Sequence, residues 1–211
     1  MTDIARPAAA GARDTPRESI LDAAARAISE RGADNARLRD IARASGLSIG
    51  ALQHHFGARD DLLAETFRQF NDESIAAFHA SARDGDPRER LAALLQLCVV
   101  PRDSWTFHEK WSVWLEFWSA SNRDPELRDH SVDIYTSWRA PFRQAIDDGI
   151  NTGLFQPRAP VEDIVDRLIA AIDGLAVRSL LEPERITPER MLKLLTDSLE
   201  SDIGASLRVA V

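Results

Sequence analysis

Apolar residues recur at intervals of three and four along most of this chain, the spacing that gives an α-helix one apolar face. No run alternates between apolar and polar residues between two turn signals, so nothing in the pattern favours a β-strand. The pattern predicts about nine helices, near residues 16–31, 38–45, 48–55, 59–83, 87–100, 105–122, 125–150, 160–181 and 188–204. The expected fold class is therefore all α.

The starts of the predicted helices carry clear sequence signals. A Thr or Asp followed by Pro is a favourable N-cap next to a first helical residue that needs no N–H. This pair occurs at Thr15-Pro16, Asp86-Pro87, Asp124-Pro125 and Thr187-Pro188. Thr106 with Glu109 three residues later forms a further capping box. These signals fix where five of the helices begin.

Residues 38–63, LRDIARASGLSIGALQHHFGARDDLL, predict two short helices that cross at a tight turn. Ala42 is small enough to let a second helix approach, and Gly46 suits the left-handed conformation at which a helix ends. Ser48 is then a natural N-cap for the next helix. This order is typical of a helix-turn-helix DNA reader, although an ordinary helical hairpin in a bundle has the same spacing.

The helix lengths also suggest how the chain is organised. Three short helices precede longer ones, which indicates a small N-terminal module on a larger helical body. We expect a disordered arm at 1–15, a DNA-binding helix-turn-helix domain at 16–58, a ligand-binding and dimerisation domain at 59–205 and a tail at 206–211.

The second short helix has the properties of a groove-reading helix. Leu47, Leu52 and Phe56 are expected to turn inward, leaving a slim leading end and polar side chains for the major groove. Arginines nearby are candidate phosphate contacts, with a solvated surface charge as the alternative for each. The predicted DNA-binding residues are Arg17, Arg37, Arg39, Ser48, Ile49, Gly50, Ala51, Gln53, His54, His55 and Arg59. Two such readers in a homodimer would bind a palindromic operator in double-stranded DNA.

The net charge of −8 is unevenly distributed. Residues 1–60 hold nine arginines and eight carboxylates, a net charge of +1, and the remainder carries −9. A near-neutral head on an acidic body is compatible with operator binding but not with general coating of nucleic acid or of an anionic membrane. No apolar run approaches the roughly 20 residues that span a bilayer, so no membrane partner is expected. The single cysteine, Cys98, lies among apolar residues and suits a core position in a cytoplasmic protein.

Aromatic residues concentrate on two neighbouring predicted helices. Trp111, Trp114 and Trp118 share one helical face, and Trp138 and Phe142 repeat the four-residue spacing on the next helix. Such faces are core positions, pocket walls or both, and with carboxylates among them they can hold a cation by cation–π attraction. The predicted ligand-binding residues are Trp105, Phe107, Trp111, Trp114, Glu116, Phe117, Trp118, Tyr135, Trp138 and Phe142. The small-molecule effector is expected to be cationic, such as a quaternary ammonium compound or a polyamine.

Two apolar stripes near the C-terminus are candidates for the dimer face, with intrachain core as the alternative. Gly174 lies inside the first of these helices, where it lowers helix stability relative to Ala, and a close helix approach would explain it. The predicted interface residues are Ile164, Leu168, Ile172, Leu175, Leu192, Leu195 and Leu199.

Enzymatic motifs are not evident in the sequence. It contains no glycine-rich phosphate loop, and HEKW at 108–111 lacks the second His of a zinc-binding helix. His54 and His55 are adjacent and point in different directions on a helix, so they do not form a metal site. We expect no enzyme activity, no metal and no cofactor. The alternatives to a regulator are a helical protein-interaction module with a degenerate reader and, after it, an enzyme.

The chain resembles the TetR family of transcriptional regulators over its full length, with the specific motifs in its first quarter. PRESILDAAARAISERG at 16–32 is similar to the family's first helix, LRDIARASGLSIGALQHHF to its second and third, and GARDDLL to the start of its fourth. Arg59 stands where the family has a basic phosphate-contacting residue, usually Lys. The resemblance implies a helical C-terminal domain with a ligand cavity, a homodimer made by the last two helices, and a repressor that releases DNA when its effector binds.

Two positions depart from the family pattern. Arg37 replaces the Thr that caps the second helix, so capping is expected to shift to Asn35 or Asp34. Gln53, His54 and the following His precede Phe56 where the family has an aromatic residue. The end of the third helix and the Trp-rich helix are similar to the choline-responsive BetI-type branch, which implies a quaternary ammonium effector.

Overall fold

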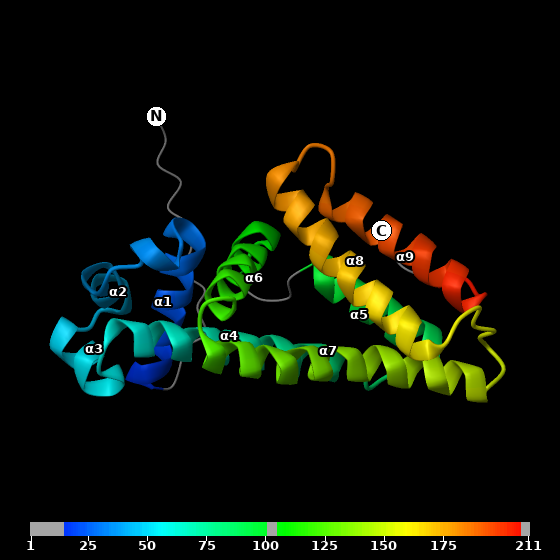
Figure 1. Cartoon of the computed structure of the whole chain (residues 1–211), viewed down its shortest axis with the longest axis horizontal. Coiled ribbons are helices and arrows are strands. Elements are labelled where there is room, and N and C mark those ends of the chain that lie inside the picture. Colours follow the sequence, from blue (N-terminus) through cyan, green and yellow to red (C-terminus); the bar gives the residue numbers. More distant parts are fainter. Residues whose placement is uncertain (1–14, 101–104, 208–211) are drawn as a thin grey trace.

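The computed structural model describes residues 15–100 and 105–207, and all of its regular elements are helical (Figure 1). They are α1 (Pro16–Arg31), η1 (Ala33–Asn35), α2 (Leu38–Ser45), α3 (Ile49–Phe56), α4 (Arg59–Ser81), α5 (Pro87–Val99), α6 (Phe107–Ser121), α7 (Pro125–Asn151), α8 (Val161–Leu181) and α9 (Pro188–Ile203). Within these residues the predicted all-α fold with nine α-helices is confirmed. The arm expected at 1–15 and the tail at 206–211 lie almost entirely outside the described residues. None of the helices in this part of the chain is long and apolar enough to cross a bilayer.

The predicted N-caps hold five helices at their starts. The side chains of Thr15, Asp86, Thr106, Asp124 and Thr187 each accept a hydrogen bond from a backbone N–H two or three residues further on. At Asp86 and Thr106 the side chain of the Glu three residues later accepts a hydrogen bond from the backbone N–H of the cap residue. Local sequence therefore determines where these helices begin.

Helix α2 begins at Leu38 as predicted, but its capping differs from the prediction. Arg37 is its N-cap and makes no side-chain capping bond, and neither Asp34 nor Asn35 replaces it. Those two residues belong to the short helix η1, and Asn35 Nδ2 instead donates to the Arg31 carbonyl at 3.1 Å. The expected shift of the cap was wrong because Ala36 and Arg37 are extended and separate both side chains from the first turn of α2.

The helices are arranged so that the N-terminal unit lies at one end of the molecule. Helices α1, α2 and α3 pack together, and α4 runs from α1 and α3 into the body, where it lies beside α5 and α7 (Figure 1). Helix α6 contacts α1 on one side and α7 and α8 on the other. The two helices α4 and α6 are therefore the physical links between the N-terminal unit and the body.

The stripes predicted to form a dimer face are part of the chain's own core. Six of the seven side chains are at most 5% exposed, and Leu175 is half-buried against them. Helix α8 packs against α7 and α9, and α9 also packs against α5, which accounts for the burial. The predicted interface residues that instead face the core of the same chain are Ile164, Leu168, Ile172, Leu192, Leu195 and Leu199.

The outer face of α8 explains why Gly174 has no close neighbour. A Cβ placed on this glycine meets no heavy atom within 4 Å, so the close approach expected there does not come from the described part of the same chain. Ala170 and Gly174 are exposed, Val177 is half-buried and Leu181 is 73% exposed. These four residues form an outward stripe of small and apolar side chains at helical spacing.

Cys98 occupies the core position that was expected. Its side chain is 3% exposed and lies near the Leu94 carbonyl, with Sγ at 3.3 Å from the oxygen. Burial raises the pKa of this thiol to about 12, so it is not a reactive thiolate at neutral pH.

Candidate DNA-reading head and aromatic effector pocket

The turn between α2 and α3 has the geometry that its sequence predicts. Gly46 has φ +74° and ends α2, with its N–H directed at the carbonyls of Ala42 and Arg43. Leu47 N–H reaches back to the Ala42 carbonyl at 3.0 Å. Ser48 then caps α3, its Oγ accepting from Ala51 N–H at 3.1 Å. The two helices are held by a glycine turn and a serine cap, as in a helix-turn-helix.

Helix α3 presents one face to the core and the other to solvent. Leu52 is 1% exposed, and Leu47 and Phe56 are partly buried against the core. Ile49 is 43% exposed, an unusual state for a large apolar side chain at the leading end of a helix. Of the predicted contact residues on this helix, Ala51 is half-buried and the exposed ones are Ser48, Ile49, Gly50, Gln53, His54 and His55.

The arginines near the reader differ in how freely they can reach DNA. Arg37 and Arg39 are exposed, and the Arg39 side chain lies 3.9 Å from Asp40. Arg17 pairs with Glu65 at 2.7 Å and lies over the ring of Phe56 at 5.3 Å.

Arg59 is tied to the backbone of the head. Its Nε donates to the Ala36 carbonyl at 3.1 Å, and its Nη2 donates to the Ala33 carbonyl. The start of α4 therefore holds the segment that joins α1 to α2. The structure gives Arg59 this positioning contact, and its phosphate contact stays a prediction.

A pocket in the body is lined by side chains of three helices. It includes five aromatic rings, Trp111, Trp114 and Trp118 of α6 and Tyr135 and Trp138 of α7, together with Ile134, Ile169, Ile172 and Asp173. The cavity itself is small, about 20 Å³. That is room for about one water molecule, so a ligand requires the surrounding side chains to move apart, and a compact ligand requires the least movement.

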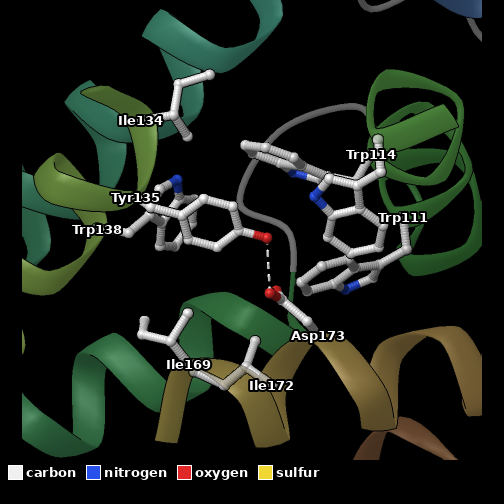
Figure 2. Close-up of a pocket in the computed structure, with 9 residues that line it drawn as sticks. Trp111, Trp114, Ile134, Tyr135, Trp138, Ile169, Ile172 and Asp173 are labelled. Atoms are coloured by element: carbon white, nitrogen blue, oxygen red, sulfur yellow. Dashed lines mark hydrogen bonds between the residues drawn. The ribbon is translucent and has the colours of Figure 1, made fainter. Parts of the chain in front are cut away.

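The one carboxylate among the lining residues lies directly opposite the tryptophans of α6. Figure 2 shows the Tyr135 hydroxyl directed at Asp173, with Trp111 and Trp114 on the facing wall and two isoleucines of α8 below. The hydroxyl donates to Asp173 Oδ2 at 2.8 Å. Trp114 also meets the edge of Trp138 with ring centres 5.9 Å apart, which joins the walls from α6 and α7.

Burial changes the protonation of both polar groups in the pocket. The pKa of Asp173 is raised to about 6, because desolvation of the charge outweighs the hydrogen bond from Tyr135. The pKa of Tyr135 is raised above its usual range, first by burial and then by the neighbouring negative charge of Asp173. Near neutral pH the pocket thus holds a desolvated carboxylate and a neutral phenol, an arrangement that favours a cation.

Five of the predicted ligand residues lie elsewhere. Trp105 is buried against Phe70, with Arg26 over its ring at 4.7 Å. Phe117 packs on Phe67 and is fully buried. Such spacing on a helix does not reveal which face meets a cavity and which meets core. Three further residues do not line this pocket. Phe107 packs against Trp111, and Phe142 packs against Phe78. The carboxylate of Glu116 contacts the N-terminal unit instead.

Four lining residues were not predicted as ligand contacts. Ile134 lies on α7, and Ile169, Ile172 and Asp173 lie on α8. Ile172 had instead been placed at the dimer face. A usable signal was present, because Asp173 is a carboxylate one residue from the apolar stripe of a helix, where burial is costly without a function.

No metal centre is indicated by the part of the chain that the structure describes, where no three His, Cys, Asp or Glu residues group as ligands.

Comparison with known proteins identifies the class to which this arrangement belongs. The family model described as "Bacterial regulatory proteins, tetR family" matches residues 20–66, and the one described as "BetI-type transcriptional repressor, C-terminal" matches residues 87–204. The chain belongs to the TetR family of transcriptional regulators and has a BetI-type C-terminal domain.

Individual relatives agree with this assignment. The chain is 31% identical to the HTH-type transcriptional regulator PksA of Bacillus subtilis over 186 residues, 88% of each protein. It is 30% identical to the HTH-type transcriptional regulator BetI of Rhizobium meliloti over 202 residues, 93% of each. Among solved structures, a proposed transcriptional regulator of Saccharomonospora viridis in complex with choline has a TM-score of 0.76 and 32% identity, over 89% of this chain and 96% of that one. A regulator of a Rhodococcus species has a TM-score of 0.75 and 26% identity, over 90% and 97%.

Proposed function

We propose that this protein is a repressor that binds a palindromic operator as a homodimer and is released by a compact quaternary ammonium effector. Residues 16–58 form the DNA-binding domain, and residues 59–205 hold the effector and make the dimer. The protein acts in the cytoplasm, and the proposal assigns it regulation rather than catalysis.

The observation that carries the effector assignment is Asp173 opposite a wall of tryptophans. A quaternary ammonium group cannot donate a hydrogen bond, so its binding relies on ring faces and on an opposite charge. Each ring contributes roughly 0.5 to 2 kcal/mol to cation binding. Asp173 supplies the opposite charge and already has its hydrogen bond from Tyr135. The complex of the Saccharomonospora relative with choline supports the same ligand class.

Charge, not shape, is therefore the property to test. Choline and 3,3-dimethyl-1-butanol have the same shape, but the second has carbon in place of the charged nitrogen. We expect choline to change the tryptophan fluorescence on binding and the neutral alcohol to bind at least tenfold more weakly, the factor given by about 1.4 kcal/mol. Betaine aldehyde and spermidine extend the series. Equal affinity for choline and the alcohol, or no response to any cation, would contradict the effector assignment.

The exposed face of α3 supports the DNA assignment. Ser48 and Gly50 give a slim, exposed leading end, and Gln53, His54 and the following His are available to base edges and phosphates. Selection from a random duplex pool should enrich a palindrome. A pool that stays random would favour the interaction module with a degenerate reader.

The outer faces of α8 and α9 replace the buried stripes as the proposed dimer surface. Gly174 and Leu181 on α8 and Leu194 on α9, the last 39% exposed, are open to a partner. A second copy can approach α8 closely at Gly174, where no side chain intervenes. Sedimentation of the Gly174→Leu variant tests this surface: it should shift the protein toward monomer, whereas an unchanged dimer would place the interface elsewhere.

A further inference from the structure

Glu116 of helix α6 makes a polar contact on the side of the helix that faces away from the pocket. Glu116 Oε2 accepts a hydrogen bond from the backbone N–H of Ala33 at 3.0 Å, across 83 positions in the sequence. Ala33 is the first residue of η1, the short segment between α1 and α2. The body of the protein thus holds the backbone of the DNA-reading head directly.

The backbone at this contact is shaped to receive the carboxylate. Gly32 has φ +79°, a conformation that side chains rarely adopt. A Cβ added to it would lie 3.2 Å from Glu116 Oε1, tighter than an ordinary contact. Glycine at position 32 therefore serves two needs, the backbone conformation and the close approach of the carboxylate.

Glu116 and the pocket residues occupy opposite sides of one rigid helix. Trp114 and Trp118 are each two positions from Glu116, which corresponds to a rotation of about 160° to 200° on an α-helix. The tryptophans line the pocket, while Glu116 faces the N-terminal unit. A ligand that moves or rotates the tryptophan face must also move the carboxylate.

The segment that Glu116 holds sets the position of the reader. Residues 32–37 connect α1 to α2, and α2 carries α3 through the Gly46 turn. Arg59 holds the other side of the same segment, through the carbonyls of Ala33 and Ala36. The segment is therefore clamped between α4 and α6, and a shift of either helix changes where α3 lies.

We propose that Glu116 is the positioning residue that couples the effector pocket to the DNA-reading head, through its bond to Ala33. The coupling runs directly from α6 to η1 and does not require α4 to bend. It rests on the proposed function, since it needs an effector in the pocket, but it concerns a contact outside the pocket. Loss of the contact should separate effector binding from DNA release, with both individual affinities retained.

The test compares Glu116→Ala with Glu116→Gln, which keeps an acceptor for Ala33 N–H. Ser119→Ala, an exposed position one turn away on α6, is the matched control. For each full-length dimer the choline affinity is measured by tryptophan fluorescence, and the affinity for the selected operator is measured with and without saturating choline. Far-ultraviolet circular dichroism and thermal unfolding check the fold.

We expect Glu116→Ala to bind choline within about twofold of the wild type, but to lose the choline-dependent change in operator affinity. In allosteric proteins this change is roughly 5- to 150-fold, and it should fall below about twofold in the alanine variant. The Gln variant should retain most of it, and the Ser119 control all of it. If Glu116→Ala keeps the full change, the coupling runs through α4 and the proposal is wrong.

A second variant removes the hydrogen bond between Glu116 and Ala33 by changing its donor in the N-terminal unit. Ala33→Pro removes the donor N–H at the first position of a helical turn, which tolerates proline. If both residues act through one bond, the double variant should uncouple no further than either single variant; additive losses would contradict the proposal.

Hydrogen exchange separates this proposal from the choice of effector. If wild-type protein binds no quaternary ammonium compound, the proposed function fails, and exchange at residues 32–37 still tests the contact. Faster exchange at residues 32–37 in Glu116→Ala than in Glu116→Gln supports the positioning role. Exchange at these residues that is unchanged in Glu116→Ala would overturn it.

Discussion

Replacing Asp173 with Asn should make the free protein more stable and the effector site weaker at the same time. The carboxyl pKa is raised from 3.8 to about 6 in the folded protein. A raised pKa means that the folded state binds the proton more tightly than the unfolded state. The ionised form therefore opposes folding at neutral pH, and this penalty develops as the pH rises from about 4 to about 6. Asn removes the charge and can still accept the Tyr135 hydrogen bond.

The size of the effect follows from the pKa difference. About two pH units at about 1.4 kcal/mol each correspond to roughly 3 kcal/mol. For a chain of this length that corresponds to a rise in Tm of roughly 6 to 12 °C near pH 7.5. At pH 4 the wild-type carboxyl is protonated in the folded state, so the difference should nearly vanish. Choline affinity should fall roughly 100-fold, because a buried cation loses its opposite charge.

The gain in stability is measured by thermal unfolding of both proteins at pH 7.5 and at pH 4. One fixed protein concentration is used, because dimerisation adds stability. Fluorescence titration with choline measures the loss of affinity. Asp163→Asn, an exposed carboxylate on the same helix, is the control and should leave choline affinity unchanged. An Asp173→Asn protein that is no more stable than the wild type at pH 7.5 would refute the reasoning about the buried charge. Unchanged choline affinity would refute its role as the opposite charge.

Other predictions test the pocket and the reader separately. Choline affinity should fall up to tenfold for each pH unit below about 6, as Asp173 takes up a proton, and a flat profile from pH 5 to 8 would contradict this. Trp118→Leu should weaken choline binding roughly 2- to 30-fold, from the loss of about 0.5 to 2 kcal/mol of cation–π attraction, and should leave the neutral alcohol's affinity nearly unchanged. The logarithm of the operator affinity should fall linearly with the logarithm of the salt concentration. If Arg39 contacts a phosphate, Arg39→Ala should reduce this slope by about one, and an unchanged slope would show that Arg39 makes no such contact.

The sequence predicted the fold well because helix signals in this chain are local. Periodic apolar positions, the Pro-containing N-caps and the Gly46 turn act within a few residues, and the helices appear within two residues of their expected ends. Helix α2 also begins at Leu38 as expected, but its predicted cap was wrong, since its cap residue Arg37 carries no capping side chain. There the position of the chain depends on Glu116 and Arg59, which lie far away in the sequence.

The sequence predicted the pocket only in part, because a pocket depends on how several helices face one another. The tryptophan stripe on α6 identified one wall, but periodicity could not separate Trp114, which lines the pocket, from Phe117, which is fully buried on the same helix. Leu168 and Ile172 share the apolar stripe of α8, yet only the second reaches the pocket. Asp173 stands out in the sequence as a carboxylate next to an apolar stripe, but its place among the tryptophans follows only from the packing of α8 against α6.

Asp173 on α8 and Glu116 on α6 illustrate how two packed helices can link a pocket that contains a destabilising buried charge to the DNA-reading helix. A desolvated carboxylate destabilises the empty protein, so a bound cation lowers the free energy of the conformation that holds it best. The differential affinity for that conformation limits how far any effector can shift the head. Because α6 carries the tryptophans on one face and Glu116 on the other, the conformation selected at Asp173 also fixes the backbone at Ala33. A ligand bound without engaging Asp173, as the neutral alcohol would be, should therefore occupy the pocket and release little DNA.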